Sequence, residues 1–246
     1  MTQDGIDQTF VLIKPDALSL SLTGYVLSQL SEFHAGLRFA GAKIVHVTRM
    51  LAEEHYAEHK GKPFFPAVVE YLMGCVHYPD SPDKRRVIAL AYSGPGAVTT
   101  VRKIAGPTSP HVARDTAPGT IRALGTIVPL KDAAGNPAGE RMDNLVHASS
   151  SPSDAQREIN LWFIPSDIMP AMRQYATEVC DDYYYLKDGN LSMTREPGSI
   201  CILAPGQMAW KSDVEAMQKI LQGEPAHCTL DAVVAKYLIN EKLETS

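Results

Sequence analysis

Several features are scarce in this 246-residue chain, and each scarcity argues against a class of protein. The four cysteines form no C-x-x-C pair, so neither a zinc site nor a disulfide framework is expected, and a reducing cytoplasmic compartment is favoured. The formal net charge is -5, which argues against a protein that binds nucleic acid through a general positive field. Apolar runs are too short to span a bilayer or to form a signal peptide, so no membrane association is expected.

A glycine-rich phosphate loop is missing as well, since neither the P-loop nor G-x-G-x-x-G occurs. A chain of this kind can bind phosphate only through side chains, and a local group of arginines would suffice despite the acidic net charge. What is present is the composition of a globular protein, with 45% hydrophobic and 21% charged residues. The length allows one ordinary domain with an appended piece.

Strand and helix patterns alternate over the first two-thirds of the chain. Strands are predicted over Thr9–Lys14, Ala42–Thr48 and Arg86–Tyr92. Helices are predicted over Thr23–His34, Glu53–Lys60 and Ala97–Ala105, and a further helix is predicted to open with a capping box at Ser153–Gln156. This mixture favours an α+β fold with an antiparallel sheet.

Three segments interrupt that pattern. Cys75–Arg85 is predicted to be a loop, and Thr126–Asp143, rich in Gly, Pro and Asp, is either a hairpin or an excursion. The chain then continues from Pro165 to Ser246, with short strands and with helices predicted over Ser212–Leu221 and Thr229–Leu243. We therefore expect a catalytic domain over residues 1–164, with insertions at about 75–85 and 126–143, and a C-terminal α/β extension of unknown role over 165–246.

The candidate phosphate-binding side chains lie in four clusters, and five short strings in and around them follow one another along the chain. These strings are KPDAL from Lys14, EHYAEHKGKPFF from Glu54, VRKIAGPTSP from Val101, PGTIR from Pro118 and NLVHAS from Asn144. In this order, and over roughly residues 8–164, the sequence resembles the nucleoside diphosphate kinase family, whose hallmark is N-x-x-H-G/A-S before a helix. The resemblance implies a ferredoxin-like βαββαβ core with a four-stranded antiparallel sheet flanked by helices.

The resemblance also implies a phosphorylated histidine intermediate at His147. The chemistry of the residue agrees, because imidazole is a good nucleophile when neutral and its near-neutral pKa keeps much of it neutral. Glu158 matches the family glutamate that holds the histidine ring, and Ser149 would assist either near that glutamate or near the leaving oxygen. A ping-pong reaction would then move the γ-phosphoryl group from ATP or GTP to a nucleoside diphosphate.

Further roles follow from the same resemblance. Phosphate contacts would come from Lys14, Arg102, Thr108 and Arg122, and Tyr56 would lie close to the histidine. Asn144 would bond the ribose, and Phe64 would stack on the base. Mg²⁺ would be held mainly by the nucleotide phosphates and water. A homo-oligomer is expected, as hexamer, tetramer or dimer, and the preferred nucleotide is left open.

Two alternatives stand beside this reading. His55 and His59 have the i, i+4 spacing of a metal pair on a helix, although H-E-x-x-H is absent and metal binding is the weaker interpretation. The chain could also be a nucleotide-binding regulatory or scaffold module with a retained but inefficient kinase pocket. Loss of the histidine or of an arginine would favour that module, and neither is lost.

Overall fold

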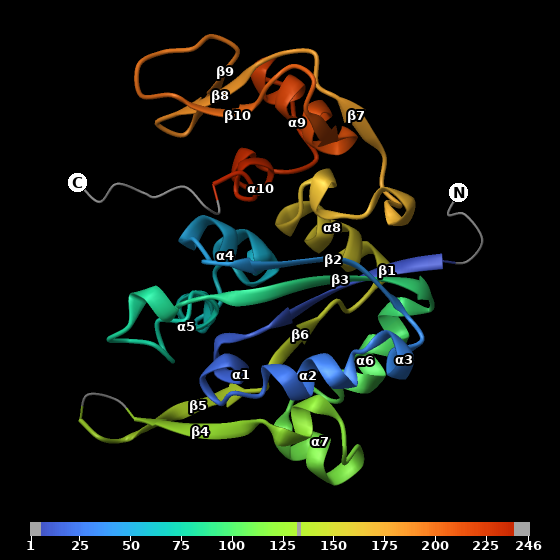
Figure 1. Ribbon diagram of the computed structural model, residues 1–246. Helices are drawn as coiled ribbons and strands as arrows, with labels where there is room; N and C mark the ends of the chain where they lie inside the picture. Colours follow the sequence, from blue (N-terminus) through green and yellow to red (C-terminus); the bar gives the residue numbers. More distant parts are fainter. Residues whose placement is uncertain (1–5, 132–133, 239–246) are drawn as a thin grey trace.

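The computed structural model describes residues 6–131 and 134–238, and its centre is one four-stranded sheet (Figure 1). The strand order is β2-β3-β1-β6, and each neighbouring pair is antiparallel. The four strands are β1 (Ile6–Ile13), β2 (Arg38–Val45), β3 (Val87–Pro95) and β6 (Val146–Ala148). The predicted α+β fold with a four-stranded antiparallel sheet is confirmed.

Helices cover both faces of this sheet (Figure 1). One face is packed by α4 (Arg49–His55), α5 (Phe65–Leu72) and α8 (Pro152–Trp162). The other is packed by α1 (Pro15–Ser19), α2 (Thr23–Gln29) and α6 (Ala97–Ala105). Two further helices, α3 (Glu32–Ala35) and α7 (Pro110–Thr116), lie beyond this second face.

Strand β1 is buried on both of its sides. Phe10 and Leu12 point into one hydrophobic cluster, and Val11 and Ile13 point into the other. None of these four side chains is exposed, which explains why this strand reads as a continuous apolar run rather than as an alternating one. Burial of each of these side chains stabilises the folded state by about 1.5–3 kcal/mol. The strand is therefore firmly packed up to the point where Lys14 follows it.

The predicted helix over Thr23–His34 is wrong in its length. The structure has two helices here, α2 and α3, with a break at Leu30 and Ser31. The hydroxyl oxygen of Ser31 accepts a hydrogen bond from the backbone N–H of His34 and starts the second helix. Phe33, which would share a face with Val26 and Leu30 in one continuous helix, is fully exposed instead.

The capping residue of α8 also differs from the prediction. Ser151, not Ser153, precedes the helix, and its hydroxyl oxygen accepts from the backbone N–H of Asp154 at 3.1 Å. Pro152 then occupies the first helical position, which suits proline because its missing N–H has no helical partner there. The helix therefore begins one residue before the predicted capping box.

The two insertions have different structures. Cys75–Arg85 is a loop with one 3-10 turn at Pro82–Lys84. The segment 126–143 is a hairpin made of β4 (Thr126–Lys131) and β5 (Pro137–Asp143), and it projects from the body beside α7 (Figure 1). Of the two structures considered for this segment, the hairpin is the one observed.

The chain beyond residue 168 forms a second layer of structure above α4 and α8 (Figure 1). Its elements are β7 (Thr177–Val179), β8 (Tyr184–Lys187), β9 (Asn190–Ser192), β10 (Ile200–Leu203), β11 (Met208–Trp210), α9 (Lys211–Leu221) and α10 (Leu230–Val234). The helix predicted over Thr229–Leu243 is shorter, since α10 ends at Val234, and residues beyond 238 lie outside the described part. The extension has its own hydrophobic cluster.

Several contacts join the extension to the body. The side chain of Trp210 is buried in the cluster of the body, and its indole N–H donates to the carbonyl of Phe163 at 2.6 Å. Gly41 on β2 is approached so closely that a Cβ there would lie 2.6 Å from the carbonyl oxygen of Asp167. The backbone N–H of Met169 donates to Ala40 of the same strand at 3.0 Å. The extension is therefore packed onto the sheet edge and not merely tethered to it.

Candidate active site

A cavity of about 250 Å³ opens between β6, α4, α6 and α8. Eight of the ten predicted site residues line it: Lys14, Tyr56, Arg102, Thr108, Arg122, Asn144, His147 and Glu158. Positions separated by more than 100 residues along the chain are thus brought to one place by the sheet and its flanking helices. Within the described residues, none of the helices has the length and apolar character needed to cross a membrane.

The register of β6 determines which way His147 points. His147 lies opposite Leu12 of β1, and Leu12 faces the cluster on the α8 side of the sheet. Side chains directly opposite each other in an antiparallel pair share a face, so His147 also points toward α8. There its Nε2 lies 2.8 Å from Oε1 of Glu158.

Glu158 is held from two directions. Its second carboxylate oxygen accepts from the Ser149 hydroxyl at 2.6 Å, and both residues are buried. Because the carboxylate accepts from Nε2–H of His147, the lone pair of the neutral ring is on Nδ1. Ser149 itself does not line the cavity but stands behind the glutamate, at the first of its two expected places.

Positive charge gathers in the cavity in spite of the acidic chain. Lys14 and Arg122 are buried, whereas Arg102 in the last turn of α6 is exposed. Burial and, to a smaller degree, the nearby Arg102 lower the pKa of Arg122 to about 10. Burial likewise lowers the pKa of Lys14 to about 8. Such depressed values mark cations that lack water and would gain from an anionic partner.

Lys14 is fixed by contacts to two neighbouring side chains. Its ammonium group donates to the hydroxyl oxygen of Tyr71 at 3.1 Å and to Oδ1 of Asn144. The Asn144 amide donates in turn to the carbonyl of Thr108 at 2.8 Å. Leu145, next along the chain, has a φ of 68° and is held there by the carboxylate of Asp16, which accepts from its N–H at 2.8 Å.

His55 belongs to the same site, although the sequence suggested it only as half of a metal pair. Its Nδ1 accepts from the indole N–H of Trp162 at 3.3 Å, and its ring meets that of His147 edge-on at 4.5 Å between centroids. Burial lowers the pKa of His55 well below its usual value, and the adjacent His147 lowers it further. The ring is therefore neutral, with its proton on Nε2.

His55 and His59, considered above as the weaker, metal-binding interpretation, do not lie on one helix, because α4 ends at His55. A different group, His55, His147 and Glu158, brings possible ligand atoms within 4.8 Å of one another. Metal ligation through Nε2 of His55 would require the lone pair that the Trp162 contact places on Nδ1. The hydrogen bond to His55 thus argues against a metal site at this group.

A sequence model of the nucleoside diphosphate kinase family matches residues 7–168. This chain belongs to the nucleoside diphosphate kinase family. The nucleoside diphosphate kinase of Pyrococcus furiosus is 39% identical over 163 residues, which are 66% of this chain and 86% of that protein. That of Thermus thermophilus is 37% identical over 164 residues, covering 67% of this chain and all of that protein.

Solved structures of the family agree. The Aquifex aeolicus nucleoside diphosphate kinase superposes with a TM-score of 0.53 at 30% identity, over 67% of this chain and 99% of that one. The Halobacterium salinarum nucleoside diphosphate kinase, solved in complex with CDP, superposes with a TM-score of 0.50 at 32% identity. The superposition covers 66% of this chain and 91% of that one. The chain is therefore a nucleoside diphosphate kinase, a transferase that acts on nucleotides, and the regulatory-module alternative is not favoured. Enzymes of this family need a divalent cation.

Besides Ser149, one more predicted site residue of the kinase, Phe64, does not line the cavity. Phe64 precedes α5 and is 47% exposed, and its ring lies edge-on to the ring of His59, with 5.4 Å between centroids. Six cavity residues were given no role by the sequence analysis: Glu58, Val146, Ala148, Ser150, Asp154 and Arg157. For Asp154 a usable signal existed, because it lies four residues before Glu158 on α8 and residues four apart share a helix face.

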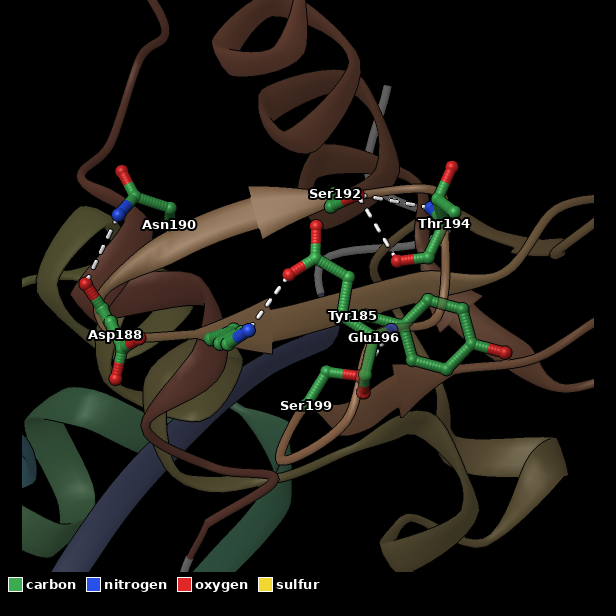
Figure 2. A pocket seen from close by; sticks show the side chains of 8 residues that line it. Tyr185, Asp188, Asn190, Ser192, Thr194, Glu196 and Ser199 are labelled. Carbon is green, nitrogen blue, oxygen red and sulfur yellow. Dashed lines mark hydrogen bonds and ion pairs between the residues drawn. The ribbon is translucent and has the colours of Figure 1, made fainter.

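A second hollow, of about 300 Å³, lies in the extension of the kinase (Figure 2). Its polar groups are paired with one another: the Lys187 ammonium contacts Glu196 at 2.8 Å, and Ser192 bonds the backbone of Thr194. Both members of the ion pair are solvent-accessible, so it adds little to stability. Nothing in this hollow resembles the concentration of cations around His147.

Proposed function

We propose that the kinase works through a phosphohistidine formed at Nδ1 of His147. The contact of His147 Nε2 with Glu158 at 2.8 Å carries this proposal, because it leaves the lone pair on the other nitrogen. That nitrogen attacks the γ-phosphorus of a nucleoside triphosphate such as ATP or GTP, and the bond to the bridging oxygen breaks as the diphosphate leaves. A nucleoside diphosphate then takes the phosphoryl group from Nδ1 and restores the histidine.

The cations of the cavity support transfer by binding phosphate oxygens. Arg102 and Arg122 have planar groups that can bind two oxygens at once, and Lys14 adds a point charge from the end of β1. Thr108 and Tyr56 line the same cavity and supply hydroxyl groups that can also bind phosphate oxygens. Stabilisation of the charge spread over the moving phosphoryl group is the main catalytic contribution in reactions of this type.

Mg²⁺ is the proposed divalent cation, and it is held by the nucleotide. Three carboxylates line the cavity: Glu158 is engaged by His147, Asp154 by Ser150 and Ser151, and Glu58 lies 3.6 Å from Nε2 of His59. The cavity therefore offers no ready cage of free protein oxygens, which suits an ion that keeps its waters and the phosphate oxygens as ligands. The ion would neutralise phosphate charge, while orientation and proton positions depend on the side chains.

Recognition of the nucleoside is assigned to Asn144 for the ribose and to Phe64 for the base. Asn144 is within the cavity, and Phe64 stands at its margin behind His59. Stacking on an aromatic ring reads the face of a base and not its edges, so several bases would be accepted. Phe64 would have to approach the base by a side-chain rotation, for which its exposure leaves room.

Assembly and location remain predictions. We expect a homo-oligomer, for which Ile44 on β2, exposed at 63%, offers an apolar contact. Light scattering of the purified kinase should report a dimer, tetramer or hexamer, and a monomer at micromolar concentration would contradict this. The expected compartment is the cytoplasm.

The deciding experiment follows the phosphoryl group. Wild type, His147→Ala and the control His34→Ala, an exposed histidine outside the cavity, are mixed with ATP and Mg²⁺ and measured by intact mass. Wild type and His34→Ala should gain one acid-labile phosphoryl group and pass it to an added diphosphate, whereas His147→Ala should gain none. Phosphorylation of His147→Ala at the wild-type level would assign the nucleophile to another residue.

A further inference from the structure

The two insertions, at about 75–85 and 126–143, meet in one side-chain cluster. His77 comes from the loop 75–85, and Arg141 and Asp143 come from the hairpin strand β5. Nε2 of His77 lies 3.1 Å from one carboxylate oxygen of Asp143. The guanidinium of Arg141 donates to both oxygens of that carboxylate, at 2.8 and 2.9 Å. The side chains of His77 and Asp143 are both less than a tenth exposed.

This cluster stands directly behind Lys14. The ring of His77 meets the ring of Tyr71 edge-on, with 4.9 Å between centroids. Tyr71 accepts from the Lys14 ammonium at 3.1 Å, and the same ammonium lies 4.5 Å from the centre of the Tyr71 ring. On the other side, Asp143 is the chain neighbour of Asn144, which also accepts from Lys14. Tyr71 and Asn144 both contact the Lys14 ammonium; Tyr71 packs against His77, and Asn144 follows Asp143 in the chain.

We propose that His77 and Asp143 are positioning residues for Lys14, and that the loop and the hairpin act together as one support for its ammonium group. This inference rests on the proposed phosphate-binding role of Lys14. Neither residue lines the cavity, so both act through Tyr71 and Asn144 and not by contact with the substrate.

Charge supports the same conclusion. The charged groups that act on Lys14 are Asp16 from α1, Arg122 from the 3-10 turn after α7, and Asp143 from β5. Burial lowers the pKa of Lys14 to about 8, and Asp16 and Asp143 oppose that effect. Burial would raise the pKa of Asp143, but His77 and Arg141 bring it down to about 2. Asp143 is therefore an anion throughout the working range, and its charge helps to keep Lys14 protonated.

The first test is the pH profile of kcat/KM for Asp143→Asn, because kcat/KM reports the ionisation of the free enzyme. Removal of the anion lowers the pKa of Lys14, so the alkaline fall in kcat/KM should begin roughly half to one pH unit lower than in wild type. Asp167→Asn is the matched control, since it removes a carboxylate paired with a different lysine, Lys43 at 2.7 Å. Its profile should coincide with that of wild type.

The second test does not alter the charge of Asp143. His77→Ala removes both the donor to Asp143 and the ring behind Tyr71, and should lower kcat/KM by roughly threefold or more at neutral pH. His77→Gln can again place an N–H toward the carboxylate and should recover a large part of that loss. A cluster that only fastens the hairpin would lower the thermal midpoint of unfolding in both variants without this recovery of kcat/KM.

The outcomes separate the inference from the function on which it rests. If Lys14→Met retains wild-type kcat/KM, the phosphate role of Lys14 is wrong and the inference falls with it. If Lys14→Met is impaired while the profile of Asp143→Asn matches wild type, the function stands and the positioning role is overturned. If Asp143→Asn does not fold, the His77 pair decides: equal kcat/KM in wild type and His77→Ala would overturn the inference.

Discussion

Glu158 is the residue whose surroundings most affect the chemistry of His147. Burial alone would raise the pKa of Glu158, but His147, His55 and the Ser149 hydroxyl together bring it below its usual value of 4.5. The carboxylate is therefore ionised at neutral pH and fixes both the tilt and the tautomer of the histidine ring. The proposed nucleophile thus depends on a carboxylate that contacts Nε2 of the ring and not the proposed attacking atom, Nδ1.

Substitution of this carboxylate should slow the reaction far more than it weakens nucleotide binding. In Glu158→Gln the side chain keeps its size but no longer favours hydrogen on Nε2, so the nucleophilic lone pair is lost from Nδ1 in part of the molecules. We expect kcat to fall about 100-fold. Steady-state assays with ATP and a diphosphate acceptor measure this, and a kcat within twofold of wild type would contradict the role of Glu158.

The same residue predicts an acid effect on stability. A carboxyl group whose pKa is lowered by folding stabilises the native state above its unfolded pKa, here 4.5, and that contribution is lost as the pH falls through the lower native value. The free energy of unfolding of wild type should therefore decrease below about pH 4.5, and that of Glu158→Gln should decrease less. Urea unfolding at pH 7 and at pH 4 gives both differences.

At the scale of elements, α8 places Glu158 and its start is set by one hydroxyl. Ser151 accepts from the N–H of Asp154 at 3.1 Å, while Ser153 lies inside the first turn and only contacts Ser151 at 2.9 Å. The order Ser-Pro-Ser-Asp offers two possible caps, and proline at the second position decides between them because it suits the first helical residue.

Removal of the cap should therefore have a clear cost. Ser151→Ala leaves a helical N–H without its partner and should lower the free energy of unfolding by about 1 kcal/mol. Ser153→Ala is the control, with an expected change of less than about 0.5 kcal/mol. Urea unfolding followed by circular dichroism measures both. A larger loss for Ser153→Ala than for Ser151→Ala would return the cap to the position that the sequence pattern suggests.

At the scale of the whole molecule, the extension is built around a buried ion pair. The Lys236 ammonium lies 2.9 Å from a carboxylate oxygen of Asp213, joining α9 to the turn that follows α10, and both side chains are less than a tenth exposed. Burial raises the pKa of Asp213, and Lys236 only partly offsets that effect. The pair is therefore stabilising only while both of its members are present.

Breaking this pair on one side should destabilise the extension strongly. Lys236→Met leaves the Asp213 carboxyl buried without a cation and should cost about 3–5 kcal/mol. The double variant Lys236→Met/Asp213→Leu replaces the pair by apolar side chains and should recover most of that loss. Thermal unfolding of the three proteins provides the comparison. A double variant as unstable as Lys236→Met would show that the pair does more than satisfy its own charges.

Much of the fold and of the site could be predicted from short stretches of sequence. The apolar run from Thr9 to Lys14 predicts a buried strand because its side chains alternate between two faces that are both covered. The boundary at Ser31 was missed because the local pattern continues through it, and only the hydrogen bond to His34 marks the new start. Phe64 stays a prediction, because its distance from a base depends on a nucleotide and not on the neighbouring sequence.

The sequence by itself determined the family, the antiparallel α+β core and most of the side chains that meet in the cavity, because those features are written in local motifs and in the periodicity of apolar residues. Only the tertiary structure decided which distant positions touch. His77 and Asp143, 66 residues apart, share a hydrogen bond behind Lys14. Trp210 is packed into the core of the body, 47 residues after its partner Phe163. Contacts of this kind depend on the path of the whole chain, which no local pattern specifies.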